Sequence, residues 1–370
     1  MEAKKSLQEN ATSPLPYRLH RFARAMPKVE LHLHLEGSIT PETALALARR
    51  HGMTLPATDA AGLREWFRFR DFRHFVQVYL ALSEMLRTPE DFAFIVVALG
   101  RDLARQHVRY AEVTFTAYTH LWQDKGLTPD DLIAGLDAGR AQVRQQFGVD
   151  LAWIIDIPRN LSFNRLTGRY NGKASDPTVE MALAWKDRGV VALGLGGYEI
   201  GAPPEPFAHA FARARAGGLH SAPHAGEHVG PAGVWGAIRA LGAERIGHGV
   251  RAIEDPALVA YLVEHQIPLE INPTSNIRLG VYPDFASHPL RRFWDAGVFV
   301  TVNSDDPPLF NTTLNQEYGL LVDAFGFGAN ELERVSLNAV RASFLPEERK
   351  AALEANFRAE FGRLRTSILR

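Results

Sequence analysis

A pair of histidines two residues apart is the first feature of this chain that could do chemistry. His32 and His34 lie in the stretch 30–37 (ELHLHLEG), where apolar and polar residues alternate. Residues two apart on a β-strand point to the same face, so both imidazoles would project together. Such a pair can hold a metal ion, although an isolated pair is more often structural. Three later apolar runs favour the metal because they end in acid- or metal-capable residues, at 224–227 (HAGE), 245–249 (RIGHG) and 303–306 (NSDD).

Alternating strand and helix patterns position these residues. Apolar runs predict strands over 28–35, 110–115, 151–157, 190–195, 219–224, 245–248, 268–272 and 298–303, separated mostly by helical segments. Eight such units favour an α/β fold, a (β/α)8 TIM barrel, with a doubly wound open sheet as the alternative. Polar residues follow strands one, four, five, six, seven and eight. A barrel brings those ends to one mouth, whereas an open sheet spreads them along an edge.

The remaining segments are expected to cover this barrel. Residues 1–25 mix basic and polar residues with two prolines, which predicts a flexible N-terminal tail, and residues 26–370 are expected to form a single domain. The stretch at about 60–107 has no strand pattern and predicts a helical insert after strand one. Its aromatic residues form either a helix core or an apolar lid over a flat ligand. The chain from Thr312 onward predicts C-terminal helices.

Composition narrows the possible partners and cofactors. The 370 residues are 46% hydrophobic, carry a net charge of −1 and include no cysteine. A net charge close to zero gives the protein no overall electrostatic attraction for nucleic acid or acidic membranes. Without cysteine, only His, Asp and Glu remain as strong metal ligands. No membrane span and no signal peptide is predicted. We therefore expect a cytoplasmic protein with no nucleic-acid or membrane partner; the sequence does not determine the oligomeric state.

At the mouth of a barrel, four of these side chains form a candidate metal site: His32, His34, His224 and Asp305. Three imidazoles and one carboxylate suit one Zn²⁺ per chain, with a position left for water; another divalent transition metal would use the same ligands. Strand eight closes beside strand one, so Asp305 can approach the histidine pair. A two-metal hydrolase would need a bridging acid or lysine at the end of strand four, which offers none before Glu199.

Three further residues are candidate proton carriers or substrate contacts. Glu227 lies in the same turn as the ligand at 224, where a shielded carboxyl near a dication can act as general acid or base. His248, between two glycines, could bind the metal or its water. Asp306 adjoins Asp305 but points elsewhere, so one can serve the metal and the other the substrate. Singly, each stretch could be a helix cap or a tight turn; their common location favours a site.

Together the motifs resemble the adenosine/adenine deaminase family of the amidohydrolase superfamily. The resemblance spans roughly residues 26–345. Its elements occur in order at 27–37 (PKVELHLHLEG), 193–197 (LGLGG) before Glu199, 224–227 (HAGE), 245–249 (RIGHG), 273–276 (PTSN) and 303–307 (NSDDP). It implies zinc-dependent hydrolytic deamination of a 6-aminopurine nucleoside, a small-molecule substrate, to the 6-oxo product and ammonia.

The resemblance also implies roles for individual residues. The zinc ligands would be His32, His34, His224 and Asp305. Glu227 would donate a proton to the ring nitrogen next to the reacting carbon, and His248 with Asp305 would orient and deprotonate the attacking water. Asp306 would hold N7 of the purine, and the backbone of Gly197 would hold N3. The helical insert would lie over the pocket.

Two positions depart from animal-type adenosine deaminases, which carry Asp where this chain has Glu36 and Tyr198. Both are expected on the sugar side of the pocket, as substrate contacts. The forms at 194–199 (GLGGYE) and 302–310 (VNSDDPPLF) look closest to the bacterial branch acting on 6-amino-6-deoxyfutalosine in menaquinone biosynthesis. The expected substrate is that nucleoside or adenosine. Adenine, or the chemistry of a different barrel metallohydrolase, is the alternative.

Overall fold

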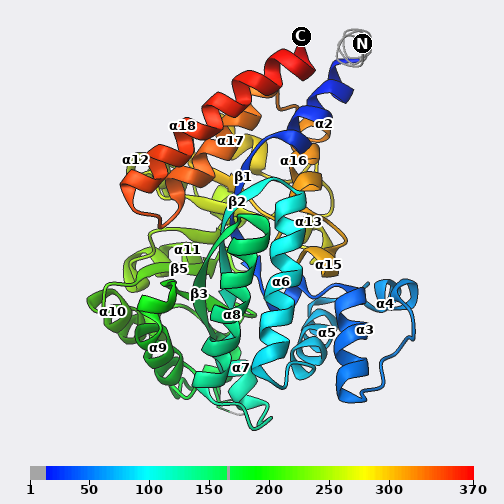
Figure 1. The fold of residues 1–370 in the computed structure, drawn as a ribbon. Helices are drawn as coiled ribbons and strands as arrows, with labels where there is room; N and C mark the ends of the chain where they lie inside the picture. Colours follow the sequence, from blue (N-terminus) through cyan, green and yellow to red (C-terminus); the bar gives the residue numbers. More distant parts are fainter. Residues whose placement is uncertain (1–13, 165–166) are drawn as a thin grey trace.

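Eight parallel strands form the barrel that the sequence predicts (Figure 1). The computed structural model describes residues 14–164 and 167–370. The strands are β1 Lys28–His34, β2 Val108–Phe115, β3 Asp150–Pro158, β4 Val190–Gly196, β5 His220–Ala225, β6 Ile246–His248, β7 Leu269–Ile271 and β8 Val300–Val302. Each pairs with the next in parallel. The barrel closes just past β8, where Asp305 N donates to His32 O (3.1 Å) and His34 N donates to Asp305 O (3.0 Å).

Burial explains why these runs become barrel strands. Every residue of β1, β6, β7 and β8 is buried. Strands covered on both faces read as nearly continuous apolar runs, as β3 and β4 do, whereas β1 carries a polar residue at every second position. The helices outside the barrel are α7 Ala117–Trp122, α8 Pro129–Phe147, α9 Ser175–Ala184, α10 Ala208–Ala216, α11 Pro231–Gly236, α12 Pro256–His265, α13 Pro273–Arg278, α14 Leu290–Asp295 and α15 Pro307–Phe310.

The predicted helical insert is confirmed between β1 and β2. It consists of α4 Ala60–Trp66, α5 Phe72–Glu84 and α6 Pro89–Arg105, and α3 Pro41–His51 precedes it. Thr40 caps α3 by accepting a hydrogen bond from Thr43 N, with proline at the first helical position. A capping box of Thr88 and Asp91 starts α6. Helix α5 reaches the barrel mouth, and the α3–α5 segment stands beside the barrel in Figure 1.

The prediction of a flexible tail over 1–25 is wrong for its second half, because Leu15–Ala25 forms helix α2. The spacing of Leu19, Phe22 and Ala23 puts three buried side chains on one face, and Phe22 packs against Phe361. The prolines that suggested disorder lie at the start of the helix, where proline is tolerated. Residues 1–13 of the predicted tail lie outside the described residues.

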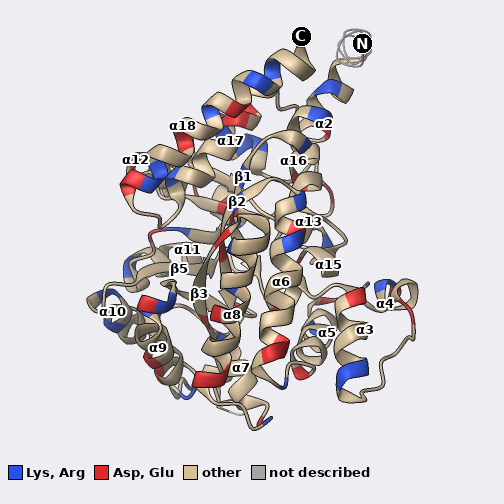
Figure 2. Ribbon diagram, in the orientation of Figure 1, with Lys and Arg blue, Asp and Glu red and all other residues tan. Residues whose placement is uncertain are grey.

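The predicted C-terminal helices cover the N-terminal end of the barrel. They are α16 Leu314–Asp323, α17 Ala329–Ala342 and α18 Glu347–Leu364, and α2 packs beside them (Figure 1). Figure 2 shows basic and acidic residues interspersed along α18 rather than gathered by sign. Among the described residues, no helix is long and apolar enough to cross a membrane.

Candidate active site

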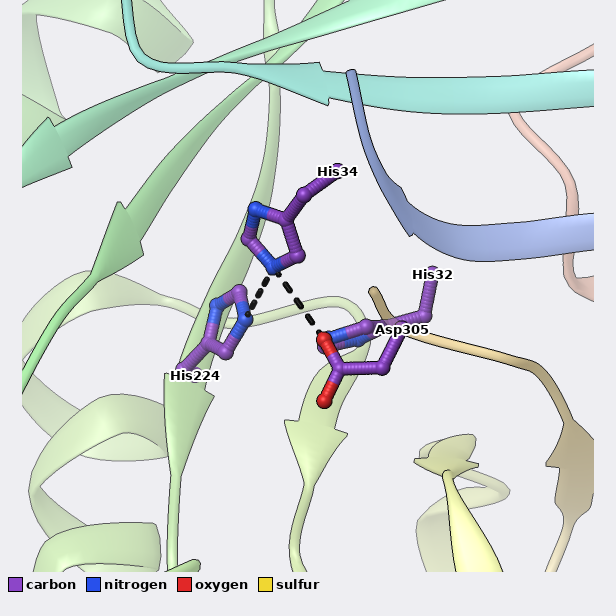
Figure 3. A group of neighbouring side chains, drawn as sticks. All are labelled: His32, His34, His224 and Asp305. Atoms are coloured by element: carbon purple, nitrogen blue, oxygen red, sulfur yellow. Dashed lines mark hydrogen bonds and ion pairs between the residues drawn. The ribbon is translucent and has the colours of Figure 1, made fainter. Parts of the chain in front are cut away.

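The four predicted metal ligands converge at the barrel mouth (Figure 3). One ligand atom from each of His32, His34, His224 and Asp305 lies within 4.8 Å of all the others. His34 Nε2 is 3.2 Å from His224 Nε2, and Asp305 Oδ1 is 3.3 Å from His32 Nε2. The histidines end β1 and β5, while Asp305 follows β8. Because β8 neighbours β1 in the closed barrel, residues far apart in sequence become neighbours.

This cluster suits a metal better than it suits a hydrogen-bond network. His32 Nε2 is buried and has no hydrogen-bond partner among the described residues, although it faces Asp305. Two imidazole nitrogens of His34 and His224 face each other, so at most one bond satisfies both. A cation among three nitrogens and one oxygen would satisfy all four atoms, and this donor set is typical of catalytic zinc sites. The chain therefore has a metal site.

A second carboxylate orients His32. Glu270 Oε2 lies 2.9 Å from His32 Nδ1, and Glu270 Oε1 accepts a bond from Arg245 Nε (2.6 Å). Metal-binding histidines commonly direct their other ring nitrogen to a carboxylate, which fixes the tautomer. In the metal-free chain, burial lowers the pKa of His32, but the Asp305 and Glu270 carboxylates beside its ring outweigh burial and raise it to about 10. A metal would compete with that proton.

The loop after His224 is held from both sides. The buried Glu199 carboxylate accepts bonds from four successive backbone N–H groups, at residues 226–229, over 2.6–3.0 Å. Arg159 is also buried, and its Nη2 donates to His224 O (2.6 Å). Glu199 therefore holds the backbone N–H groups of residues 226–229, and Arg159 holds the backbone carbonyl of His224, where the loop begins. Between them, the Glu227 side chain is carried to the cavity.

A hydrogen-bond chain assigns the tautomer of His248. The backbone Leu290 N–H donates to His288 Nδ1 (3.2 Å), so the His288 proton is on Nε2, which faces Asn276 Oδ1 (3.1 Å). The Asn276 amide nitrogen then donates to His248 Nδ1 (3.1 Å). Neutral His248 consequently carries its proton on Nε2, which lies 3.8 Å from both Glu227 Oε1 and Asp305 Oδ2. It is placed to donate a hydrogen bond into the site.

The backbone at two of these residues is unusual. His248 and Asp305 adopt φ values of +59° and +65°. Residues other than glycine rarely occupy this left-handed region, and such residues concentrate at functional sites. At both positions the conformation turns the side chain at a strand end into the barrel mouth.

The carboxyl groups of Glu227 and Asp306 have opposite pKa shifts. Burial raises the pKa of Glu227, but the His248 and His228 rings outweigh it and hold the pKa below its ordinary value. For Asp306, burial and the adjacent Asp305 both raise the pKa well above the usual range. Asp306 lies so close to Gly37 that a Cβ there would be 1.6 Å from its Oδ1. This approach explains why glycine follows the H-x-H stretch.

A cavity of about 1020 Å³, including its open mouth, extends from the metal ligands. Glu227, His248, Asp305 and Asp306 line it, together with Gly197. Its outer walls are mainly apolar and aromatic and include Phe72, Phe75, Val76, Tyr79, Leu80, Trp122, Leu161 and Leu279. Phe72, Phe75 and Tyr79 of the insert line the cavity and also pack against one another. Catalytic, metal and purine-side residues predicted from the sequence therefore share one cavity.

The structure does not bring Glu36 into this cavity. Its side chain is fully buried, and its Oε1 accepts from Thr116 N (3.1 Å) and lies 3.0 Å from His120 Nε2. Glu36 therefore supports the turn after β2 instead of facing a ligand. Tyr198 is not among the cavity-lining residues either; its ring packs against Phe72 (4.9 Å) and His228 (5.3 Å) at the mouth.

Sequence reasoning missed Asp156, Glu199 as a loop anchor, and Glu270. Asp156 is a buried acid near the end of β3 and lines the cavity. The signal that identified the other strand ends, a polar residue closing an apolar run, also applies to it. Glu270 sits inside an apolar run and Glu199 lies beyond a double glycine, so their partners are visible only in three dimensions. The barrel and its mouth define a metal-dependent hydrolase.

Comparison with known proteins narrows this class. The profile described as Adenosine deaminase matches residues 27–359. An aminodeoxyfutalosine deaminase from Streptomyces avermitilis is 41% identical over 339 residues, 91% of this chain and 92% of its own. An adenine deaminase from Albidiferax ferrireducens is 38% identical over 333 residues, 90% of this chain and 93% of its own.

Two solved structures are similar over most of the chain. An adenine deaminase from Arthrobacter aurescens has a TM-score of 0.81 at 32% identity and covers 90% of this chain and 99% of its own. An amidohydrolase from Burkholderia ambifaria with bound Zn has a TM-score of 0.85 at 27% identity and covers 96% of each chain. The chain belongs to the adenosine deaminase family and is a metal-dependent deaminase acting on C–N bonds.

Proposed function

We propose that this chain hydrolytically deaminates a 6-aminopurine nucleoside with an aromatic or apolar group at the 5′ position, using one Zn²⁺. The best candidate is 6-amino-6-deoxyfutalosine. The observation that supports it is the extent of the cavity, which continues from the metal ligands to an aromatic outer wall that includes Phe72, Phe75 and Trp122. Adenine alone would leave that wall uncovered.

The metal supplies Lewis acidity, which lowers the pKa of water to about 7. This chain positions the remaining groups. His248 Nε2–H donates a hydrogen bond to the attacking water and so orients it. Asp305 Oδ2 lies 3.8 Å from His248 Nε2 and accepts a hydrogen bond from Ser275 Oγ (2.6 Å). It takes the proton from the water. The water oxygen then forms a bond to the ring carbon that carries the amino group.

Two carboxyl groups handle the purine ring. Glu227 donates its proton to the ring nitrogen beside the reacting carbon, which breaks aromaticity and makes that carbon electrophilic. A bound purine removes water from Glu227 and adds to the burial that raises its pKa, which favours the protonated form. Burial and the adjacent Asp305 raise the pKa of Asp306, which favours its protonated form, and in that form Asp306 donates a hydrogen bond to N7. Gly197 offers its backbone N–H to N3. The C–N bond then breaks: the amino group leaves as ammonia with the proton that Asp305 took from water, and the hydroxyl proton returns to Glu227 as the C=O bond forms.

Adenosine and free adenine are the competing substrates. Adenine has a specific argument in its favour, since the Albidiferax relative and the Arthrobacter structure are adenine deaminases. One residue at the mouth distinguishes the competing substrates. Phe72 lines the cavity there, with its ring tilted against that of Tyr198, and would contact a 5′ aromatic group, whereas free adenine would not reach it.

The test is a comparison of kcat/KM for 6-amino-6-deoxyfutalosine, adenosine and adenine on zinc-loaded protein, followed by ammonia release. The proposal predicts that the 5′-aromatic nucleoside exceeds the other two by orders of magnitude. Phe72→Ala should raise KM for that nucleoside and leave KM for adenine unchanged; Phe94→Ala, outside the cavity, is the control. A preference for adenine would contradict the nucleoside assignment.

A further inference from the structure

The cavity has two chemically different sides. The metal ligands and His248 come from β1, β5, β6 and the end of β8, and they define where the amino group reacts. The opposite side is formed by the ends of β2, β3 and β4. There, Thr116, Asp156 and Gly196 line the same cavity. A substrate whose reacting carbon faces the metal must extend its far end toward these three residues.

Asp156 is an incompletely satisfied acid on that side. Its side chain is 2% exposed, and its Oδ1 has no hydrogen-bond partner among the described residues 14–164 and 167–370. Thr116 supplies one hydrogen bond to the carboxyl group. Burial raises its pKa to about 7 despite that bond. A buried, unpaired carboxylate oxygen is costly, so a structure that retains one at a cavity wall has a place for a ligand donor.

The neighbouring backbone is shaped around this carboxyl group. A Cβ at Gly196 would lie 2.3 Å from Asp156 Oδ2, and a Cβ at Gly194 would lie 2.9 Å from Asp156 Cβ. Glycine at these positions lets Asp156 lie against β4. Thr116 is fixed in turn, because Glu36 accepts its backbone N–H (3.1 Å). The Asp156 side chain is therefore held from two strands and cannot turn toward solvent.

We infer that Asp156 is a specificity residue that accepts a hydrogen bond from a ribose hydroxyl of the nucleoside, with Thr116 orienting its carboxyl group. The inference rests on the proposed function and deepens it, because it names the residue that distinguishes a nucleoside from a free base. The catalytic groups Glu227, His248 and Asp305 all lie across the cavity, so Asp156 has no part in the proton transfers. A hydroxyl donor satisfies the free oxygen without adding charge to a buried acid.

The test combines substitution of Asp156 with removal of single ribose hydroxyls from the substrate. The nucleoside that ranks first in the comparison above is used with its 2′-deoxy and 3′-deoxy forms on zinc-loaded wild type, Asp156→Ala and the near-isosteric Asp156→Asn. Wild type should lose about tenfold to a hundredfold in kcat/KM when the bound hydroxyl is removed, which is the range for a hydrogen bond to a charged group. In Asp156→Ala, the ribose and deoxy forms should react almost equally, with the change carried mainly by KM.

Asp150→Asn is the matched control, since Asp150 is an acid at the opposite end of β3 that pairs with Arg349. It should discriminate between the ribose and deoxy forms as wild type does. If kcat/KM falls by the same factor for the ribose and deoxy forms in both Asp156 variants, the discrimination of wild type persists without Asp156. That result would overturn the inference while leaving nucleoside deamination standing. If adenine is the only substrate of wild type, the proposed nucleoside deamination is refuted, and the inferred contact with ribose is refuted with it.

Discussion

Replacing Glu199 with glutamine tests whether the loop that carries Glu227 is positioned by one carboxylate. Oε2 accepts from the N–H groups of residues 227, 228 and 229, and Oε1 accepts from Gly226 (2.8 Å). Glutamine keeps one oxygen and replaces the other with an NH₂ group. The fewest hydrogen bonds are lost when the NH₂ replaces Oε1, which accepts only one. In that orientation the NH₂ group and the Gly226 N–H, both donors, face each other. The variant therefore loses a bond, gains a repulsion and weakens the remaining bonds by removing the charge.

The size of the effect follows from these contacts. Hydrogen bonds to charged groups contribute about 1.5–3 kcal/mol and neutral ones about 0.5–1.5 kcal/mol. One lost charged bond, and three bonds that each weaken by about 1–1.5 kcal/mol, give a decrease of about 4–8 kcal/mol in the free energy of unfolding. A displacement of Glu227 by about 1 Å would lower kcat about a hundredfold. The metal should remain, because Arg159 still holds the carbonyl of His224.

Three measurements on Glu199→Gln check this reasoning: urea unfolding, kcat on the preferred nucleoside, and zinc content after dialysis. Glu264→Gln, an exposed acid on α12, controls for loss of one negative charge. We expect Glu199→Gln to be destabilised and slow but metal-replete. An unfolding free energy within about 0.5 kcal/mol of wild type, with unchanged kcat, would refute the role of this carboxylate.

Three further predictions concern single acids. Glu227→Gln should keep its zinc and lose turnover, as measured by metal analysis beside ammonia release; a fully active variant would rule out the proton donor. Glu270→Gln should weaken metal affinity about 10–100-fold by releasing His32, which a competition assay with a chelator measures. Asp156→Asn should stabilise the substrate-free protein at high pH. Since the folded pKa of Asp156 is about 7 against an ordinary 3.8, stability is lost as pH rises through about 7. The variant's advantage in urea unfolding should grow above pH 4 to a plateau near pH 8 of at most about 4 kcal/mol; an advantage that shrinks with pH would contradict this.

The parts of the site that the sequence could predict are those carried by strand periodicity. His32 and His34 share a face because they are two apart, and the barrel topology places His224 and Asp305 beside them. The sequence does not predict helix α2 because Pro14 and Pro16 suggest an irregular segment, although proline is compatible with a helix start.

Side-chain direction could not be predicted. Glu36 follows the histidine pair directly, yet its carboxylate turns to Thr116 and His120 instead of the cavity. Asp156 and Glu270 lie within buried strands, and which face of a strand meets a cavity depends on strand register around the barrel. Glu199 binds four amides of a loop nearly thirty residues away, a relation that leaves no local pattern.

The central claim, that one metal held by His32, His34, His224 and Asp305 supports deamination, is tested most directly by a metal titration. Chelator-treated protein receives zinc in steps, and ammonia release from the preferred nucleoside is measured at each step. We expect a linear rise that reaches its plateau at one metal per chain, and no recovery in His224→Ala. A plateau at two metals per chain, or full activity in the metal-free protein, would contradict it.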